Sequence, residues 1–213
     1  STAMTQNFSG AFPPAGWSVV DNIGTGNIWA RNVDFGVSNY THGTGFSADA
    51  DSGAVCGVTG WDTELQSPLI DLTAATNPQL SFYSNFQDYA GAGEAWVYLS
   101  NDGGTTWDTL YHQTTDDSPA SVGTQRVLDL TDYAGDNVKL SFRYSDNNDG
   151  CAWFWQIDDV SVIDRAYPEN TKLLVNTVWD DTAPPTDIDT KVLGPTPSLL
   201  GTGLLDGPEP SYF

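Results

Sequence analysis

Short stretches in which apolar and polar residues alternate recur through the first 165 residues of the chain. A period of two is typical of β-strands with one buried face, and no segment of ten or more residues here keeps the 3.6-residue period of an amphipathic helix. The pattern therefore predicts an all-β domain. The clearest expected strands are Ser67–Thr73, Leu80–Ser84, Ala95–Ser100, Arg126–Leu130 and Val138–Tyr144.

The most apolar segment of this region, Cys151–Ile163, is expected to be the central strand of the domain. Its apolar residues fall on two opposite parities, with the pair Asp158–Asp159 between them. The residues of the first parity, which we expect to face the core, are Trp153, Trp155 and Ile157; those of the second are Val160 and Val162. A strand buried on both faces would explain this pattern, and so would a β-bulge at the aspartate pair.

One local pattern occurs twice, about 60 residues apart. Ile70–Thr73 reads Ile-Asp-Leu-Thr and is followed by Leu-Ser-Phe at Leu80–Phe82, and Leu128–Thr131 is followed by the same Leu-Ser-Phe at Leu140–Phe142. Two copies are too few for a repeat array. We interpret them as equivalent strand pairs in two facing sheets, and expect a β-sandwich.

Charge narrows the range of partners, because 28 acidic residues against 7 basic ones give a net charge of −21. Nucleic acid and anionic membrane surfaces are therefore excluded as expected partners, and no run of 18 apolar residues is present to span a bilayer. The abundance of Gly, Ser, Thr, Asn and Trp suits a secreted, extracellular β protein. So many carboxylates also favour a bound cation, for which Ca²⁺ is the natural candidate.

The candidate calcium ligands are acids expected near strand ends: Asp21, Asp49, Asp51, Asp158 and Asp159. If the sandwich is a jelly roll, in which the first and last strands commonly pair, Asp21 is expected to approach Asp158. A disulfide at Cys56 would bring Asp49 and Asp51 toward the same end. No EF-hand loop is present, so the site would be composite. The alternative is a solvated acidic surface.

The two cysteines, Cys56 and Cys151, are 95 positions apart. An even number of cysteines in a secreted chain predicts a disulfide, and two buried free thiols are the alternative. Asn7-Phe-Ser and Asn39-Tyr-Thr are N-glycosylation sequons, which agree with secretion.

No coherent catalytic constellation is found. The motifs His42-Gly-Thr and Asp51-Ser-Gly resemble those of subtilases, but their order is reversed and no Gly-Thr-Ser serine motif follows. The segment Ser100–Trp107 fits the Asp-box S-x-D-x-G-x-T-W, for which we expect a structural hairpin. We therefore predict that this chain is not an enzyme by itself.

The aromatic residues leave a sugar-binding role open. Trp153 and Trp155 are expected in the core, whereas an exposed stacking platform would come from residues elsewhere. The candidates for it, among which the sequence does not choose, are Tyr83, Tyr89, Trp96 and Tyr111.

Residues 7–164 resemble the cleaved-adhesin, or choice-of-anchor J, module, which is a MAM-like jelly roll. The matching motifs are Phe12–Asn22, Leu65–Leu72, Leu80–Phe82, Leu128–Gly135 and Ile157–Val160. The resemblance implies a two-sheet β-sandwich that often binds calcium, is non-catalytic, and is appended to secreted proteases and adhesins.

Composition changes after Asp164, since seven of the 12 prolines lie in the last 48 residues. We expect domain 1–164 to be followed by an appendage, 165–213, consisting of a linker and a short β-rich segment. Strands are predicted at Leu173–Trp179 and Ile188–Leu193. This segment resembles the opening strands of the β-sandwich that follows the catalytic domain in secreted subtilases.

The first functional hypothesis is a calcium-stabilised, non-catalytic accessory module of a secreted, subtilisin-like protease. Its partners would be the catalytic domain of the parent protease and an extracellular protein or glycan. The second hypothesis is a carbohydrate-binding or cell-surface-binding adhesin module.

Overall fold

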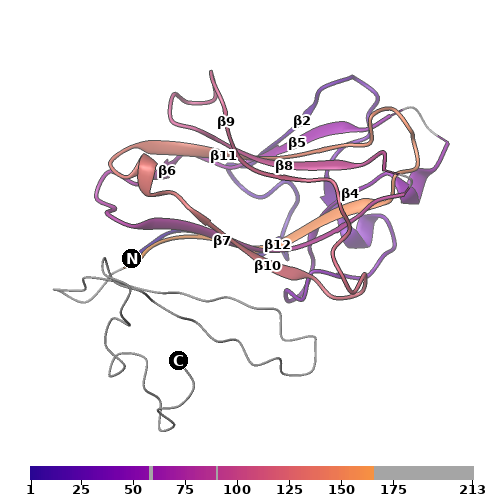
Figure 1. Cartoon of the computed structure of the whole chain (residues 1–213), viewed down its shortest axis with the longest axis horizontal. Coiled ribbons are helices and arrows are strands. Elements are labelled where there is room, and N and C mark those ends of the chain that lie inside the picture. Colours follow the sequence, from indigo (N-terminus) through magenta and orange to yellow (C-terminus); the bar gives the residue numbers. More distant parts are fainter. Residues whose placement is uncertain (58–59, 90, 166–213) are drawn as a thin grey trace, which may run out of the picture. The chain divides into compact units, whose positions relative to one another are not determined.

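Two antiparallel β-sheets pack face to face in the computed structural model, which describes residues 1–57, 60–89 and 91–165 (Figure 1). This is the all-β sandwich that the alternating pattern predicts. Within the described residues, the only helical elements are three 3₁₀ turns: η1 Asn32–Asp34, η2 Gly53–Val55 and η3 Thr131–Tyr133. None of these has the length or hydrophobicity that a membrane-crossing helix needs.

The first sheet, called sheet A, has the order β10-β7-β12-β4-β3, and β1 also pairs with β12. Its strands are β10 Thr124–Asp129, β7 Pro78–Gln87, β12 Phe154–Asp164, β4 Ala48–Asp51, β3 Ala30–Arg31 and β1 Thr2–Gln6. Sheet B has the order β2-β5-β11-β8-β9, with β6 also paired to β11. Its strands are β2 Ser18–Asp21, β5 Asp62–Gln66, β11 Asn137–Ser145, β8 Glu94–Ser100, β9 Asp108–Gln113 and β6 Ile70–Asp71.

The segment Cys151–Ile163 contains the central strand, as predicted, because β12 lies between β7 and β4 in sheet A. A β-bulge interrupts the strand at the aspartate pair. Three residue steps from Asp158 to Ser161 oppose two steps on β7, and Asp159 has a φ of +46°. The extra residue reverses the parity of the strand, so Val160 and Val162 are buried like Trp155 and Ile157.

Two expectations about strands were wrong. Trp153 is not a core residue: it precedes β12, has a φ of +34°, and is 43% exposed. The strand expected at Ser67–Thr73 is confined to β6, Ile70–Asp71. Pro68 has no N–H to continue a ladder, and the Ser67 hydroxyl instead accepts a hydrogen bond from the Leu140 amide.

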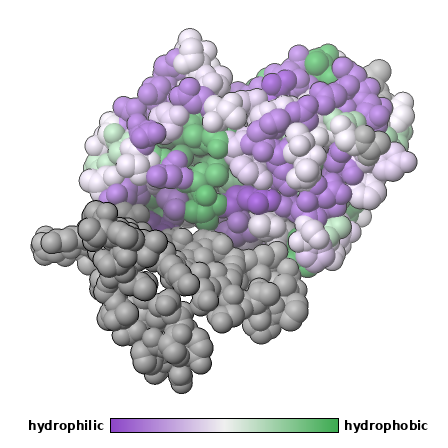
Figure 2. All heavy atoms as spheres, in the orientation of Figure 1, coloured by the Kyte–Doolittle hydropathy of each residue, from purple (hydrophilic) through white to green (hydrophobic). Residues whose placement is uncertain are grey.

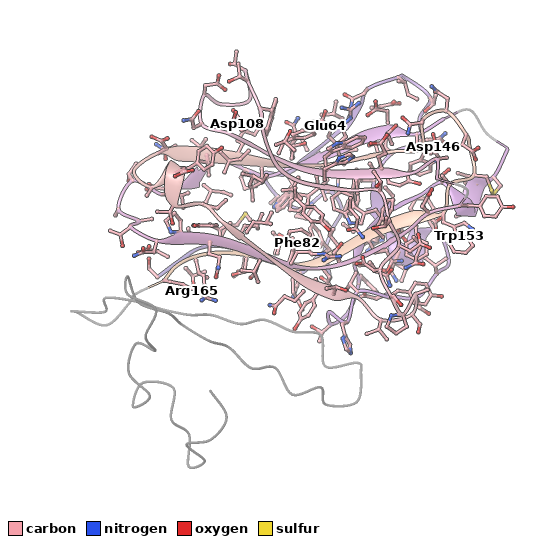
Figure 3. The ribbon with its side chains drawn as sticks, in the orientation of Figure 1. Glu64, Phe82, Asp108, Asp146, Trp153 and Arg165 are labelled. Atoms are coloured by element: carbon pink, nitrogen blue, oxygen red, sulfur yellow. A yellow bond between two sulfur atoms is a disulfide. The ribbon has the colours of Figure 1, made fainter. Side chains whose placement is uncertain are left out.

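Large rings fill the space between the sheets. Trp29 meets Trp155 edge-on, with centroids 5.4 Å apart, and Phe82 meets Phe142 in the same way at 5.4 Å. Figure 3 shows Phe82 between the two layers. Hydrophilic residues cover much of the described surface in the view of Figure 2, while apolar ones gather in one area. Aromatic rings from both sheets therefore pack edge-to-face in the core.

The repeated Asp-Leu-Thr pattern marks equivalent corners. After β6, the Asp71 carboxylate accepts hydrogen bonds from the amide and hydroxyl of Thr73, and after β10 Asp129 does the same for Thr131. Both corners lead from one sheet to the other, from β6 to β7 and from β10 to β11. The two copies are therefore equivalent, but each contributes one strand to each sheet, so that β6 pairs with β11 and β7 pairs with β10.

The predicted appendage lies outside the described residues, apart from Arg165. The expected strands Leu173–Trp179 and Ile188–Leu193, and the boundary after residue 164, therefore stay predictions.

Candidate functional site

The outer face of sheet A carries three rows of side chains that run across neighbouring strands. The first row is Gln87–Phe154–Asp51, on β7, β12 and β4 respectively. The second row is Asn85–Gln156–Asp49, and the third is Tyr83–Asp158. Pairing in register places the members of each row side by side. Their alternation with the core residues of the same strands points them away from the sandwich interior.

The second row is buried and holds loops over the sheet. The side-chain oxygen Oε1 of Gln156 accepts the Tyr40 amide at 2.8 Å, and the Asn85 side chain donates to the main-chain carbonyl oxygens of Tyr40 and Ala120. Gln156 also donates to Asp49 at 2.9 Å. These hydrogen bonds hold the segments around residues 40 and 120 over the second row, and they give Gln156 and Asn85 partners in the buried face.

The first row forms part of the wall of an open hollow of about 450 Å³. A volume of this order is typical of ligand sites. Tyr40 leans over the row and stacks on Phe154, with centroids 5.8 Å apart and planes 28° apart. The complete lining is Val37, Tyr40, Asp51, Gly53, Ala54, Gln87, Ala120, Ser121, Trp153 and Phe154. The hollow therefore combines aromatic walls with two polar side chains from the sheet, those of Asp51 and Gln87.

Two exposed aromatic residues stand together at this end of the domain. Trp153 is 43% exposed and lines the hollow, and Tyr89 is 57% exposed with its ring centroid 6.1 Å from that of Trp153. Exposed apolar side chains that adjoin one another are a feature of interaction surfaces and ligand grooves. Tyr89 was among the expected stacking residues, whereas Trp153 was not.

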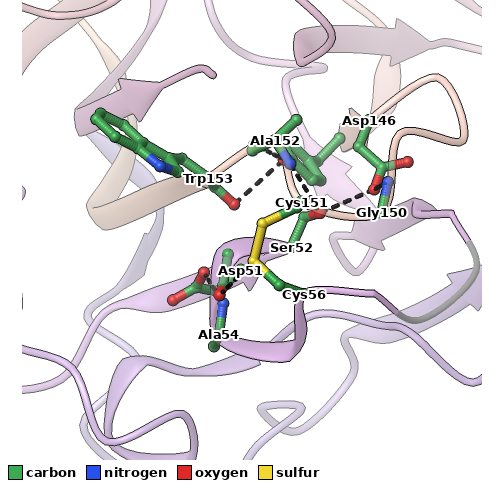
Figure 4. The surroundings of a disulfide bond; sticks show 11 residues. Asp51, Ser52, Ala54, Cys56, Asp146, Gly150, Cys151, Ala152 and Trp153 are labelled. Atoms are coloured by element: carbon green, nitrogen blue, oxygen red, sulfur yellow. Dashed lines mark hydrogen bonds between the residues drawn. A yellow bond between two sulfur atoms is a disulfide. The ribbon is translucent and has the colours of Figure 1, made fainter. Parts of the chain in front are cut away.

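A disulfide between Cys56 and Cys151 closes the same end of the domain, as predicted (Figure 4). The Cα atoms of the two cysteines are 4.5 Å apart. Backbone hydrogen bonds accompany the disulfide, from Gly53 to the Trp153 carbonyl and from Gly57 to the Gly150 carbonyl, each at 3.0 Å. The backbone of Trp153 is thereby hydrogen-bonded to the turn that follows Asp51, which limits where its indole can lie.

Asp146 is a structural acid that the sequence did not single out. Its buried carboxylate accepts four hydrogen bonds, which hold the loop before Trp153 against the turn after β4. The donors are the hydroxyl of Ser52 and the amides of Trp61, Asn148 and Gly150. A hint was present in the sequence Asp146-Asn-Asn-Asp-Gly, which is typical of a tight turn.

The electrostatics of β4 are unusual because two acids two positions apart are both buried. Burial, followed by the nearby Asp51 charge, raises the pKa of Asp49 well above its usual value. Burial also raises the pKa of Asp51, against the opposing effect of the Ala54 and Gly53 amides. Asp49 Oδ1 is buried without a hydrogen-bond partner, so this part of the sheet favours neutral or cationic species over anions.

The five predicted calcium ligands do not converge. Among the described residues, no three His, Cys, Asp or Glu side chains are grouped so that they could hold a metal ion. Asp21 does not approach Asp158, because β2 pairs with β5 in sheet B while β12 lies in sheet A. The Asp21 carboxylate instead accepts the amides of Ile23, Gly24 and Gly26, of which the Gly26 bond contributes most to lowering its pKa.

Asp158 is the predicted ligand that is best placed for a cation. It is fully buried at the bulge, where its carboxylate accepts the amide of Asp159 and the side-chain amide of Asn39, and no cationic group contacts it within the described residues. Burial raises the pKa of Asp158 to about 7. A second hollow of about 460 Å³ lies at the bulge and is lined by Thr5, Gln6, Asn7, Asp159, Val160 and Ser161.

The two sequons differ in environment. Asn7 is exposed, and its side-chain oxygen accepts the Ser9 amide. The Asn39 side-chain nitrogen donates to Asp158 at 2.8 Å and to the Gly45 carbonyl at 3.3 Å. Since a glycan attaches to this nitrogen, modification of Asn39 would break its hydrogen bond to Asp158 at the bulge.

The other aromatic candidates do not offer a free platform. Trp96 lies between neighbours from the strands on either side: the His112 ring is 4.9 Å away and parallel within 2°, and the Arg143 guanidinium is 5.2 Å away. Tyr111 is half-buried, with Arg126 5.5 Å from its ring centroid. Tyr83 is half-buried within the third row.

The remaining motifs have structural positions. The Asp-box Ser100–Trp107 forms the β8–β9 hairpin, in which Asp102 accepts the amides of Thr105 and Thr106. His42, with a φ of +72°, is exposed in the loop that crosses sheet A. The prediction that the chain is not an enzyme stays a prediction.

Comparison with known proteins gives similarity in structure only. No family model and no curated protein matches the sequence. The K1 cleaved adhesin domain of Lys-gingipain from Porphyromonas gingivalis W83 superposes with a TM-score of 0.59 and 22% identity, over 78% of this chain and 100% of that one. The fold is that of the cleaved adhesin domains. The K3 domain of the same protein gives a TM-score of 0.56 with 19% identity, over 76% of this chain and 99% of that one.

Proposed function

We propose that residues 1–165 form a non-catalytic binding module that attaches a secreted parent protein to an extracellular surface. The supporting observation is the hollow on sheet A, whose lining includes exposed Trp153 and the buried acid Asp51. The ring of exposed Tyr89 lies next to that of Trp153. Solvent-exposed aromatic residues around a preformed hollow are typical of recognition sites. The disulfide agrees with an oxidising, extracellular location.

The parent is proposed to be a secreted, subtilisin-like protease. The similar structures are domains of a larger protein, Lys-gingipain, which supports a module attached to a parent. The subtilisin-like class rests on the resemblance of residues 173–195 to a subtilase segment. In this arrangement the catalytic domain of the parent is a partner of the module. The module itself contributes no reacting group and acts by keeping the enzyme near its substrate, which raises the local concentration of the two.

Calcium is proposed to stabilise the module at the bulge of β12. The candidate donors are hard oxygens: the carboxylate of Asp159, which lines the hollow at the bulge, and that of the adjacent Asp158, which accepts a hydrogen bond from Asn39. Such a donor set suits Ca²⁺ rather than Zn²⁺. A cation would compensate the charge of Asp158, which burial otherwise disfavours.

Retention of the purified 213-residue chain on extracellular material tests the binding function. The test compares wild type with Trp153→Ala on immobilised matrix proteins, polysaccharides and cell surfaces. Ile23→Ala is a matched control, because both residues are 43% exposed and Ile23 lies elsewhere. We expect Trp153→Ala alone to abolish retention. Equal retention of all three proteins, or hydrolysis of a peptide or glycoside substrate by the wild type, would contradict the proposal.

A further inference from the structure

Resting on the proposed function, a more specific inference concerns the ligand class. We propose that the hollow lined by Trp153, Asp51 and Gln87 binds a neutral saccharide. One sugar ring stacks on the exposed indole of Trp153, and its hydroxyl groups donate hydrogen bonds to the Asp51 carboxylate and the Gln87 carbonyl oxygen.

The polar side chains from the sheet act as acceptors. Both amide hydrogens of Gln87 are used, one on Asn85 Oδ1 at 3.0 Å and the other on the Asp117 carbonyl at 2.8 Å. The carbonyl oxygen is therefore the polar atom that Gln87 has left for a ligand. Asp51 contributes a carboxylate, an acceptor group when ionised, whose orientation is fixed by the Ala54 amide at 2.8 Å. Two fixed acceptors call for a ligand with several hydroxyl donors.

Charge excludes acidic ligands from the same hollow. Its lining contains no Lys, Arg or His, and the buried Asp49 neighbours Asp51 along β4. The net charge of the chain is −21. A sulfated or uronic acid glycan would bring a further negative charge against these carboxylates without a counter-ion.

The aromatic wall supplies what a sugar ring needs besides its hydroxyl groups. Trp153 presents indole surface to solvent, and the stacked pair Tyr40–Phe154 closes the hollow on the side of the sheet. An amphipathic ring can bury its C–H face on such a surface while its edge makes hydrogen bonds. Backbone hydrogen bonds on either side of Cys151 keep Trp153 in place before binding, so little ordering entropy is lost on association.

A basic peptide is the competing ligand, because a guanidinium or ammonium group would also suit Asp51 and Trp153. Extended peptides are usually recognised through main-chain pairing at a free sheet edge. Here Gln87, Phe154 and Asp51 lie on β7, β12 and β4, and β12 pairs with both of the others. All three strands are internal in sheet A. The hollow thus offers side chains rather than a strand edge, which favours the saccharide.

The experiment uses the full chain on an array of neutral and acidic oligosaccharides, followed by calorimetry with the best neutral binder and with a Lys- and Arg-containing peptide. The variants are Trp153→Ala, Trp153→Phe and Asp51→Asn, with Ile23→Ala as control. We expect neutral oligosaccharides to bind, Trp153→Ala and Asp51→Asn to weaken binding at least about tenfold, and the control to bind like wild type. Trp153→Phe keeps an aromatic face and should bind with intermediate affinity, which keeps the test valid if another variant folds poorly.

The dependence on salt separates the two ligand classes. Stacking and hydrogen bonding of a neutral sugar should change less than about twofold between about 0.05 and 0.5 M salt, whereas pairing of charges weakens. Preference for acidic glycans, or salt-sensitive peptide binding that needs Trp153, would refute the inference of a neutral saccharide ligand. Either result would leave the proposed function as a binding module standing. Retention on surfaces that needs Trp153 but involves no glycan would also refute the saccharide ligand and keep the binding function. Loss of any role for Trp153 in retention would instead refute the proposed function.

Discussion

The Gly53 amide donates a hydrogen bond to the Trp153 carbonyl at 3.0 Å. This bond joins two segments that are 100 positions apart, one following β4 and the other preceding β12. The exposed indole and the Asp51 carboxylate are therefore held near one another, although Asp51 ends β4 and Trp153 lies just before β12.

Replacing Gly53 with alanine should disturb this arrangement. A Cβ atom there would lie 3.2 Å from both Asp51 Oδ1 and the Cα of Trp153, so one of them must move. We expect a loss of about 1–3 kcal/mol in the free energy of unfolding, as for other overpacked sites, together with weaker ligand binding. Gly10→Ala is the control, since its Cβ would meet no atom within 4 Å. Calorimetric unfolding and binding measurements on both variants decide the point; unchanged values for Gly53→Ala would contradict it.

Removal of the disulfide should lower stability substantially. The bond closes a loop with a sequence separation of 95, and the chain-entropy model gives about 4–5 kcal/mol for a loop of this length. We expect Cys56→Ser combined with Cys151→Ser to unfold at a much lower urea concentration than wild type. A reducing agent should lower the midpoint of the wild type and leave that of the double variant unchanged. Two free thiols in non-reduced wild-type protein, measured by mass spectrometry, would show that the bond does not form.

Calcium should raise the melting temperature if it binds at the bulge. At a concentration 100 times the dissociation constant, a ligand of the folded state adds about 2.7 kcal/mol of stability. We expect the melting temperature to fall in chelator and to recover with Ca²⁺, but less with Mg²⁺, which gives up its waters reluctantly.

An Asp158→Asn variant should lose this calcium response, while Asp21→Asn should keep it. The Asp21 carboxylate lies at the end of β2 in sheet B and already accepts hydrogen bonds from three amides of the loop that follows. A wild-type melting temperature that is the same in chelator and in calcium would leave these acids as an acidic surface without a metal.

The Asp-box should make the free energy of unfolding depend on pH in the acid range. The hydrogen bond from the Thr106 amide, followed by those of the Ser100 and Thr106 hydroxyls, lowers the pKa of Asp102 well below its ordinary value of 3.8. A pKa lowered in the folded state stabilises the fold above the unfolded-state pKa, and this contribution disappears as the pH falls below about 4.

We therefore expect wild type to lose more stability than Asp102→Asn between about pH 5 and pH 2.5. Exposed Asp132 provides the control, because Asp132→Asn should keep the acid sensitivity of wild type. The measurement is urea unfolding at a series of pH values. Parallel curves for wild type and Asp102→Asn would show that the hairpin does not hold the carboxylate in its ionised form.

The sequence by itself determined those features that depend on neighbouring residues. Period-two alternation predicts the strands because successive side chains point to opposite faces. The Asp-box and the corners at Asp71 and Asp129 are local hydrogen-bonded turns, so their few residues are sufficient to specify them. The apolar positions change parity at Asp158–Asp159, and a β-bulge was one of the two interpretations of this change. One extra residue in a strand reverses which positions face the core.

Only the tertiary structure decided which side chains meet. Asp51, Gln87 and Phe154 form a row because three strands from distant parts of the chain pair in one register, and no local pattern encodes that register. Trp153 leaves the core because its backbone turns to a positive φ before β12 begins, which ends the alternation on which the prediction depended. Asp21 and Asp158 are separated because β2 and β12 enter different sheets, and the choice of sheet depends on the packing of the whole domain.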